Sequence, residues 1–214
     1  ADQVVIYHTN DVHGHLQGDG SSAVGIDYVA ALHVSAPNSL LVDAGDATQG
    51  MPVVSLSKGA SAIELMNAAG YGAMCLGNHE FDFGQEVLLT NAEAAEFPML
   101  SANVVRKDSG DALLAGVGAC GDGATAVLEC GGRHIGVFGI TTASTSHSTS
   151  PANVEGLQFE YEVEAARRCI ADLAAQGVDA IVALCHLGDG PVSCRAVDLA
   201  AELEPEEAAM LCAI

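Results

Sequence analysis

The sequence has 214 residues, and 50% of them are hydrophobic, which predicts a folded chain of one large domain and excludes a disordered one. Its 28 acidic residues against 7 basic ones give a formal net charge of -21, so we expect no binding to nucleic acids, whose phosphate backbones are also negative. No apolar run approaches the ~18 to 20 residues of a transmembrane helix, so we expect no transmembrane segment.

Strands and helices are predicted to alternate along the chain. Runs of β-branched and aromatic residues predict strands at 4–9, 39–43, 73–76, 134–141 and 180–185, and weaker runs indicate strands at 99–103 and 126–129. Apolar residues spaced by three or four predict helices at 60–70, with Gly70 as the stop, at 85–97 and at 161–177. The Ser- and Thr-rich segment 141–159 is predicted as a loop, and 201–214 as a helix. This alternation is typical of an α/β protein with helices on the sheet faces.

Polar clusters follow several of the predicted strands at the point where each strand ends. They are NDVHGH at 10–15, AGDATQG at 44–50, GNHEFD at 77–82 and CHLGDG at 185–190. Because loops at the carboxyl ends of strands converge on one edge of an α/β sheet, we expect their polar side chains to meet there. The side chains concerned are Asp11, His13, Asp46, Asn78, His79 and His186.

Carboxylate, imidazole and amide groups together form the ligand set of Zn, Mn, Fe or Ni. A carboxylate shared between two divalent ions about 3.5 to 4 Å apart would give a two-metal site. Asp46 is the natural bridge, because Gly45 before it has no side chain to keep a metal or substrate away from the backbone. Such cations would also overcome the repulsion between this acidic chain and a phosphate group.

The order of these blocks resembles the calcineurin-like metallophosphoesterases: D-x-H, then G-D, then G-N-H-E, then a later His. Within that family, HTNDVHGH, VDAGDATQG, LGNHEFDFG, LSANV and SPANVEGL resemble the branch of 5′-nucleotidases, UDP-sugar hydrolases and 2′,3′-cyclic phosphodiesterases. The resemblance runs from about residue 4 to about residue 190. It implies an αββα sandwich, in which two mixed sheets pack face to face with helices on the outer faces.

The resemblance also implies a role for each site residue. Asp11 and His13 would bind a first divalent metal ion, Asp46 would bridge, and Asn78 and His186 would bind a second. His79 would contact the phosphoryl oxygen or the leaving group, and Asp82 would orient His79. The implied reaction is hydrolysis of a phosphate ester, with His79 stabilising the negative charge that develops.

The pattern departs from the family toward its end. A GHxH-type block should follow the strand that carries His186, but residues 187–214 contain no histidine, and the usual nucleoside-binding domain is also absent. We therefore expect residues 1–214 to be a metallophosphoesterase catalytic domain that is incomplete at its C-terminal end. Three ligands remain for each ion when Asp46 is counted twice, which is enough for a catalytic zinc that also binds water.

The sequence leaves several alternatives open. The substrate implied by the resemblance is a 5′-nucleotide, with a 2′,3′-cyclic nucleotide or a nucleotide sugar as the alternative. A non-catalytic surface or binding module with an incomplete metal site is a rival of another class. Export is expected from the resemblance alone, because no basic and apolar leader opens the chain. The 7 cysteines are expected to be buried thiols, with a Cys120–Cys130 disulfide as the alternative.

Overall fold

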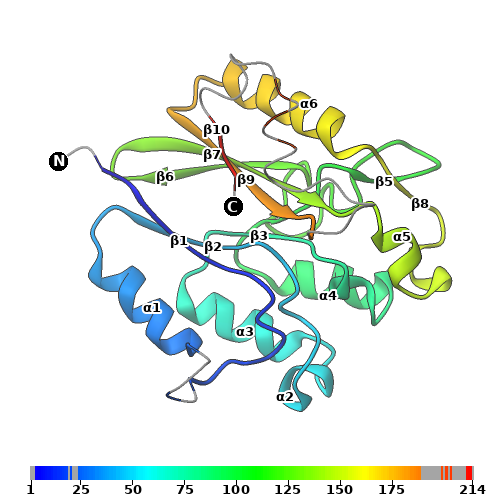
Figure 1. The fold of residues 1–214 in the computed structure, drawn as a ribbon, viewed down its shortest axis with the longest axis horizontal. Helices are drawn as coiled ribbons and strands as arrows, with labels where there is room; N and C mark the ends of the chain where they lie inside the picture. Colours follow the sequence, from blue (N-terminus) through cyan, green and yellow to red (C-terminus); the bar gives the residue numbers. More distant parts are fainter. Residues whose placement is uncertain are drawn as a thin grey trace.

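The computed structural model describes residues 3–18, 20, 24–188, 199, 201, 203 and 211–213. Its main feature is a pair of four-stranded sheets that lie against each other, with helices on both outer sides. Figure 1 shows α1, α3 and α4 on one side of the paired sheets and α6 on the other. The described residues therefore form the predicted αββα sandwich. No helix among these residues is long and apolar enough to cross a membrane.

The first sheet contains only parallel strands, in the order β1-β2-β3-β4. Its strands are β1 (Val5–Thr9), β2 (Ser39–Asp43), β3 (Ala73–Cys75) and β4 (Met99–Leu100). The connecting helices are α1 (Ile26–Ser35), α2 (Pro52–Ser55), α3 (Ala60–Ala69) and α4 (Gln85–Ala94), with a short 3-10 helix η1 (His79–Phe81) after β3. Thr9 pairs with Asp43 at the carboxyl ends of β1 and β2, so the loops that follow these two strands leave the sheet at the same level.

The second sheet is mixed, in the order β10-β9-β7-β6. It contains β6 (Thr125–Cys130), β7 (Arg133–Thr141), β9 (Ala180–His186) and β10 (Leu211–Ala213), and only the β6–β7 pair is antiparallel. Helix α6 (Glu162–Ala175) covers its outer face. A separate antiparallel pair joins β5 (Val104–Arg106) to β8 (Leu157–Phe159). The prediction of two mixed sheets therefore applies to the second sheet, whereas the first is parallel throughout.

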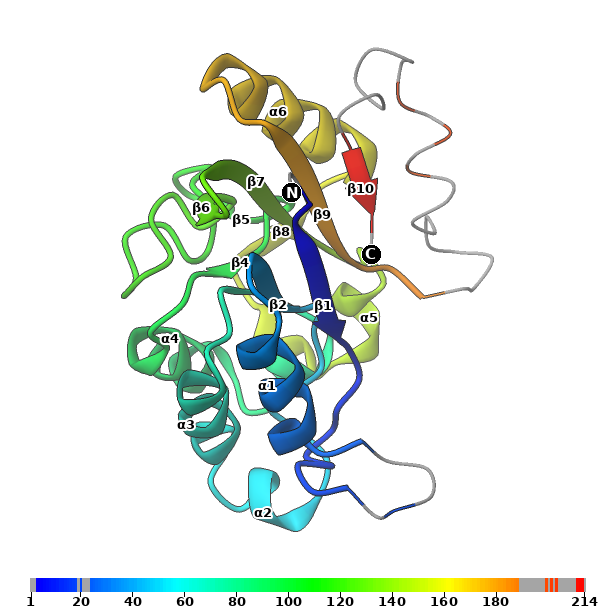
Figure 2. The ribbon, with the colours of Figure 1, turned by 90° about the vertical axis from the view of Figure 1, so that its left-hand side faces the viewer.

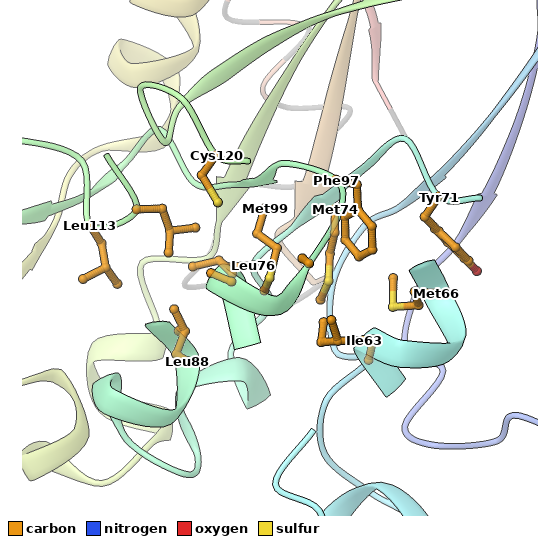
Figure 3. Close-up of a cluster of buried hydrophobic side chains, with 14 of the residues drawn as sticks. Ile63, Met66, Tyr71, Met74, Leu76, Leu88, Phe97, Met99, Leu113 and Cys120 are labelled. Carbon is orange, nitrogen blue, oxygen red and sulfur yellow. The ribbon is translucent and has the colours of Figure 1, made fainter. Parts of the chain in front are cut away.

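Three layers of buried apolar side chains hold this sandwich together. The layer between the sheets combines Val42 and Cys75 from the first sheet with Val137 and Leu184 from the second. A second layer lies between the first sheet and its helices; Figure 3 shows Ile63, Met66, Met74 and Leu88 among its members. The third layer joins the second sheet to α6. Full burial of each such side chain stabilises the fold by roughly 1.5 to 3 kcal/mol, so the layers fix how the two sheets sit on one another.

Two predicted segments differ from the structure. The expected loop 141–159 carries α5 (Thr145–Ser148), a 3-10 helix η2 (Pro151–Val154) and β8. Although its composition is polar, Val154 and Leu157 are buried in the core beside the first sheet, and β8 pairs with β5. Residues 211–213 form β10 rather than part of a helix, since they pair in parallel with β9. Most of the remaining predicted tail helix lies outside the described residues. The predicted stop of α3 at Gly70 is confirmed by its left-handed φ of 80°.

Four of the cysteines that the structure describes in full are free thiols in the interior. Cys75, Cys120, Cys130 and Cys169 are buried, and Cys185 is half-buried. The expectation of buried thiols is thus confirmed for these four, and the alternative Cys120–Cys130 disulfide is wrong. Cys194 lies outside the described residues, and the side chain of Cys212 is not described.

The side chain of Asp43, at the end of β2, is fully buried. Its Oδ2 accepts a hydrogen bond from Thr9 Oγ1 at 2.6 Å, and its Oδ1 accepts one from the backbone N–H of Gly45 at 2.8 Å. Burial raises the pKa of the Asp43 carboxyl to about 7, although both hydrogen bonds oppose that rise. A raised acid pKa contributes stability that is full below the unfolded value and is lost as the pH rises through the folded value.

We predict that Asp43→Asn removes this part of the pH dependence of folding. The amide has the same shape and carries no charge. Between pH 5 and pH 8 the wild type should therefore lose on the order of 2 kcal/mol of unfolding free energy that the variant keeps, which is a gain for the variant relative to the wild type. Urea unfolding of the metal-free proteins at both pH values measures this gain, with the exposed Asp108→Asn as control. An equal pH dependence in wild type and Asp43→Asn would contradict the prediction.

Candidate metal centre

The predicted site residues lie at the carboxyl ends of strands from both sheets. Asp11 and His13 follow β1, Asp46 follows β2, and Asn78 and His79 follow β3. His186 is the last residue of β9 in the second sheet. The site thus lies where the edges of the two sheets meet, as the strand-end rule predicts.

Two groups of possible metal ligands share the carboxylate of Asp46. Asp11, Asp46 and His186 can offer ligand atoms that all lie within 4.8 Å of one another, and so can His13, Asp46 and His79. Asp11 Oδ1 also lies 3.8 Å from His13 Nε2, so Asp11 is close to members of both groups. Carboxylates and imidazoles in this number fit divalent transition metals.

In the carboxylate of Asp46, one oxygen accepts a backbone hydrogen bond and the other faces the histidines of the two ligand groups. Oδ1 accepts a hydrogen bond from the backbone N–H of His79 at 2.8 Å. Oδ2 lies 3.2 Å from His186 Nε2 and 3.7 Å from His13 Nε2. A single oxygen atom therefore faces imidazoles from both sides. Asp46 is 2% exposed, so water competes little for this atom.

Backbone carbonyls set the orientation of two histidines. His186 Nδ1 lies 2.9 Å from Ala44 O, and His13 Nδ1 lies 3.1 Å from Gln49 O. A carbonyl oxygen can only accept, so Nδ1 of each ring carries the proton. In the neutral imidazole, Nε2 then has its lone pair free for a metal.

His186 and Asp46 form an ion pair. Burial alone would lower the pKa of the His186 imidazole, but its hydrogen bond to Asp46 and the charge of that carboxylate raise it to about 9. Burial would raise the pKa of Asp46, and the pairing with His186 lowers it. At neutral pH the pair is therefore charged, and a metal that binds both groups must displace a proton from His186.

Asn78 lies beside this pair, as predicted. Its Oδ1 is 3.3 Å from His186 Nε2, so the amide oxygen is directed at the same nitrogen that faces Asp46. Asp46, Asn78 and His186 thus come together. The grouping by distance differs from the predicted one in two respects. Asp11 lies within reach of His186 as well as of His13, and His79, which was not predicted as a ligand, falls in the group with His13 and Asp46.

His79 and Asp82 form a close pair next to the cluster. His79 Nδ1 lies 2.6 Å from Asp82 Oδ2, and 36% of the His79 side chain is exposed. Burial alone would lower the pKa of His79, but the hydrogen bond and charge of Asp82, together with the charge of Asp46, raise it. The His79 ring stands edge-on to that of His13, with 5.1 Å between the ring centroids. The structure therefore places an imidazole with a raised pKa beside the metal-ligand cluster.

Two contacts to Asp82 come from residues that were not predicted as site residues. Thr149 Oγ1 lies 3.4 Å from Asp82 Oδ1, and Asn153 Nδ2 donates to the backbone oxygen of Asp82 at 3.0 Å. Both belong to the segment that was predicted as a plain loop. For Thr149 the high Ser and Thr content was the signal, and Asn153 lies in the SPANVEGL run that resembles the 5′-nucleotidase branch. Neither signal specifies which side chain reaches which partner.

A small cavity of about 280 Å³ opens beside the cluster. It is lined by Asn10, Asp11, Ala44, Cys185, His186, Leu187 and Gly188. Asp11 and His186 form part of its wall, so a small ligand in the cavity would contact the candidate metal ligands.

The sequence profile of the calcineurin-like phosphoesterases matches residues 4–208. The chain belongs to the calcineurin-like phosphoesterase family. Members of this family use divalent metal ions, and the donor groups around Asp46 fit that chemistry. The match covers the whole segment, about residues 4–190, that resembles this family, and it confirms the resemblance.

Several similar proteins carry the name 5′-nucleotidase. The chain is 37% identical over 199 residues to a 5′-nucleotidase of Diplobatis ommata, in a match that covers 87% of this phosphoesterase and 33% of the relative. The crystal structure of a 5′-nucleotidase precursor from Thermus thermophilus matches with a TM-score of 0.75 and 34% identity, over 86% of this chain and 37% of that one. The Haemophilus influenzae NAD nucleotidase matches with a TM-score of 0.69 and 29% identity, over 85% and 34%. The chain spans about a third of the length of the curated relatives it matches.

We predict that Gly77→Ala disrupts the cluster while leaving the fold intact. A Cβ at residue 77 would lie 2.1 Å from Asp46 Oδ1 and 2.7 Å from Asp46 N, so the Asp46 carboxylate would have to move. We expect the affinity for Mn²⁺ to fall by roughly 10- to 100-fold. Isothermal titration calorimetry measures the affinity, and circular dichroism checks the fold.

The matched control is Gly72→Ala, at the other end of β3. A Cβ there would lie 3.3 Å from a terminal carbon of Leu128, which can adjust. This variant should bind Mn²⁺ like the wild type. Unchanged Mn²⁺ affinity in a folded Gly77→Ala variant would contradict the prediction, because metal binding would then not depend on the present place of the Asp46 carboxylate.

Proposed function

We propose that this phosphoesterase hydrolyses phosphate esters with two divalent metal ions and that its substrates are 5′-nucleotides. The observation that carries the proposal is the shared Asp46 carboxylate, which lies between two groups of donors with the His79–Asp82 pair beside them. The names of the similar proteins support nucleotides as the substrate class.

We assign the first ion to Asp11, His13 and Asp46 and the second to Asp46, Asn78 and His186, and Mn, Zn or Fe would fit these ligands. Two ions bound there would offset the negative charge of the phosphate group and lower the pKa of an attacking water. The net charge of -21 gives the protein no comparable means of attracting a phosphate.

The His79–Asp82 pair would act on the oxygen that gains negative charge. The carboxylate of Asp82 favours the protonated imidazole, which can donate a hydrogen bond to that oxygen or a proton to the leaving group. Asp82 also fixes the ring through Nδ1, which leaves Nε2 as the donating atom. We therefore propose His79 as the catalytic residue and Asp82 as the residue that orients it.

We further propose that residues 1–214 are the metal-binding catalytic part of the protein and that the protein is exported. The proposal of export is supported by the similar Thermus thermophilus protein, which is described as a 5′-nucleotidase precursor. Expression of the full-length gene product tests the proposal of export, because an exported protein should be secreted from the expressing cell.

The metal content of the purified chain tests the two-ion assignment. After loading with Mn²⁺ and removal of free metal, we expect two ions per chain and a sharp loss in Asp46→Ala, because Asp46 serves both ions. Plasma mass spectrometry measures the content. One ion per chain in the wild type, unchanged in Asp46→Ala, would overturn the shared-ligand assignment.

Release of phosphate from AMP in the presence of Mn²⁺ tests the activity. His79→Ala should lower the rate by roughly 10²- to 10⁴-fold, the range for a lost general acid or base. His134→Ala is the matched control, because His134 is exposed on β7 and only its backbone bonds to Asp179. A panel with 2′,3′-cyclic AMP, a UDP-sugar and NAD separates the substrate classes. No turnover of any of these by a chain that holds two ions would favour the non-catalytic binding module.

A further inference from the structure

Glu80 is a buried acid in the loop that carries Asn78 and His79, and it is 3% exposed. Its Oε2 accepts hydrogen bonds from the backbone N–H groups of Gly77 at 2.7 Å and Asp46 at 2.9 Å. Its Oε1 accepts bonds from Ala47 N at 3.0 Å, Thr48 N at 3.1 Å and Thr48 Oγ1 at 3.0 Å. One side chain thus ties the loop after β3 to the loop after β2.

These contacts leave Glu80 no capacity to bind a metal. Two carboxylate oxygens offer about four lone-pair positions, and the five donors already occupy them. An ionised carboxylate satisfied in this way can remain buried, whereas the loss of its partners would leave several N–H groups without an acceptor. The role of Glu80 must therefore lie in the backbone that it holds.

That backbone is unusual in its conformation. Asp46 has a φ of 63°, Asp11 of 50° and His13 of 47°, so three candidate metal ligands lie in the left-handed region. Residues other than glycine stay in this region only when their surroundings impose it, at a cost of about 1 to 3 kcal/mol each. Glu80 provides such a restraint directly at Asp46, whose N–H it binds.

The restraint passes from the Asp46 loop to the loop after β1. The backbone N–H of Asp11 donates to Gly45 O at 2.9 Å, and that of His13 donates to Asp46 O at 3.0 Å. Both acceptors lie next to the segment that Glu80 binds. The position of Glu80 therefore affects the ligands on three loops.

We propose that Glu80 is a positioning residue that holds the Asp46 loop in its metal-binding conformation before any ion binds. The inference rests on the proposed metal site, and it adds that the site is assembled in the metal-free protein by a residue that touches no metal. Glu80 acts through Asp46 and is not a catalytic residue.

Glu80→Gln tests this role with a side chain of the same size. Whichever way the amide is placed, its NH₂ group faces at least two of the N–H donors and cannot accept from them. We expect amides 46–48 and 77 of the metal-free variant to exchange with deuterium at least 10-fold faster than in the wild type. The affinity for Mn²⁺ should fall by roughly 10- to 100-fold, the range for the loss of a residue that orients a metal ligand.

Two further variants separate positioning from charge and from loss of the fold. Glu80→Asp keeps the negative charge but is too short to reach both loops, so it should bind Mn²⁺ as poorly as Glu80→Gln. Thr48→Val removes one of the five donors and keeps the other contacts, so it should fold and show a several-fold loss of affinity. Thr48→Val still tests the positioning role if Glu80→Gln does not fold.

The matched control is Glu162→Gln. Glu162 is 4% exposed and accepts the backbone N–H of Ala143 at 2.9 Å, so it is also a buried glutamate that binds a loop. Its loss should lower the melting temperature without changing the Mn²⁺ affinity. An equal loss of affinity in this control would mean that general destabilisation explains both variants.

Two results would overturn the proposal. One is wild-type Mn²⁺ affinity in Glu80→Gln, and the other is full affinity in Glu80→Asp, which would mean that Glu80 contributes charge alone. A wild-type chain that binds no Mn²⁺ would instead refute the proposed function. Unchanged exchange at amides 46–48 in metal-free Glu80→Gln would still refute the positioning role, so the two failures are distinguishable.

Discussion

The site depends on the close approach of the loops that follow β2 and β3. A Cβ at Gly45 would lie 2.7 Å from Gly77 N and 2.8 Å from His186 Nδ1, and a Cβ at Gly77 would overlap the carboxylate of Asp46. Only two residues without side chains let the loops come this close. The result is that Asp46, from one loop, receives the N–H of His79 from the other.

His186 reaches this contact from the second sheet, so the packing of the sheets also sets the geometry. Thr141 at the end of β7 pairs with His186 in register. Its hydroxyl donates to Leu76 O in the first sheet at 2.8 Å, and the Asn103 side chain bonds to both its backbone groups. These buried polar contacts fix the end of the second sheet against the end of β3, where the ligand-bearing loops begin.

The sequence was informative about the loops because each block of predicted ligands directly follows a mainly apolar strand, so local pattern and site coincide. It was less informative wherever a contact joins distant segments. Helix α1 was missed because it has no fully buried residue and hence a weak apolar period. Strand β10 was missed because only its pairing with β9 distinguishes it from an apolar helical turn. The contacts of Thr149 and Asn153 with Asp82 depend on the fold of α5 and η2, which composition does not encode.

Three carboxylates, those of Asp43, Glu80 and Asp46, are buried at this edge of the first sheet, and each has a different set of partners. Asp43 has a pKa raised to about 7 by burial, so near neutrality it is partly protonated. Burial and the neighbouring charge of Asp46 raise the pKa of Glu80, and its bonds from backbone N–H groups oppose that rise and occupy its oxygens. Asp46 alone is paired with an imidazole, that of His186, whose proton a metal ion would displace. Of the three, it is therefore the one whose charge is available to a cation, which supports the bridging role proposed for this residue and not for its neighbours.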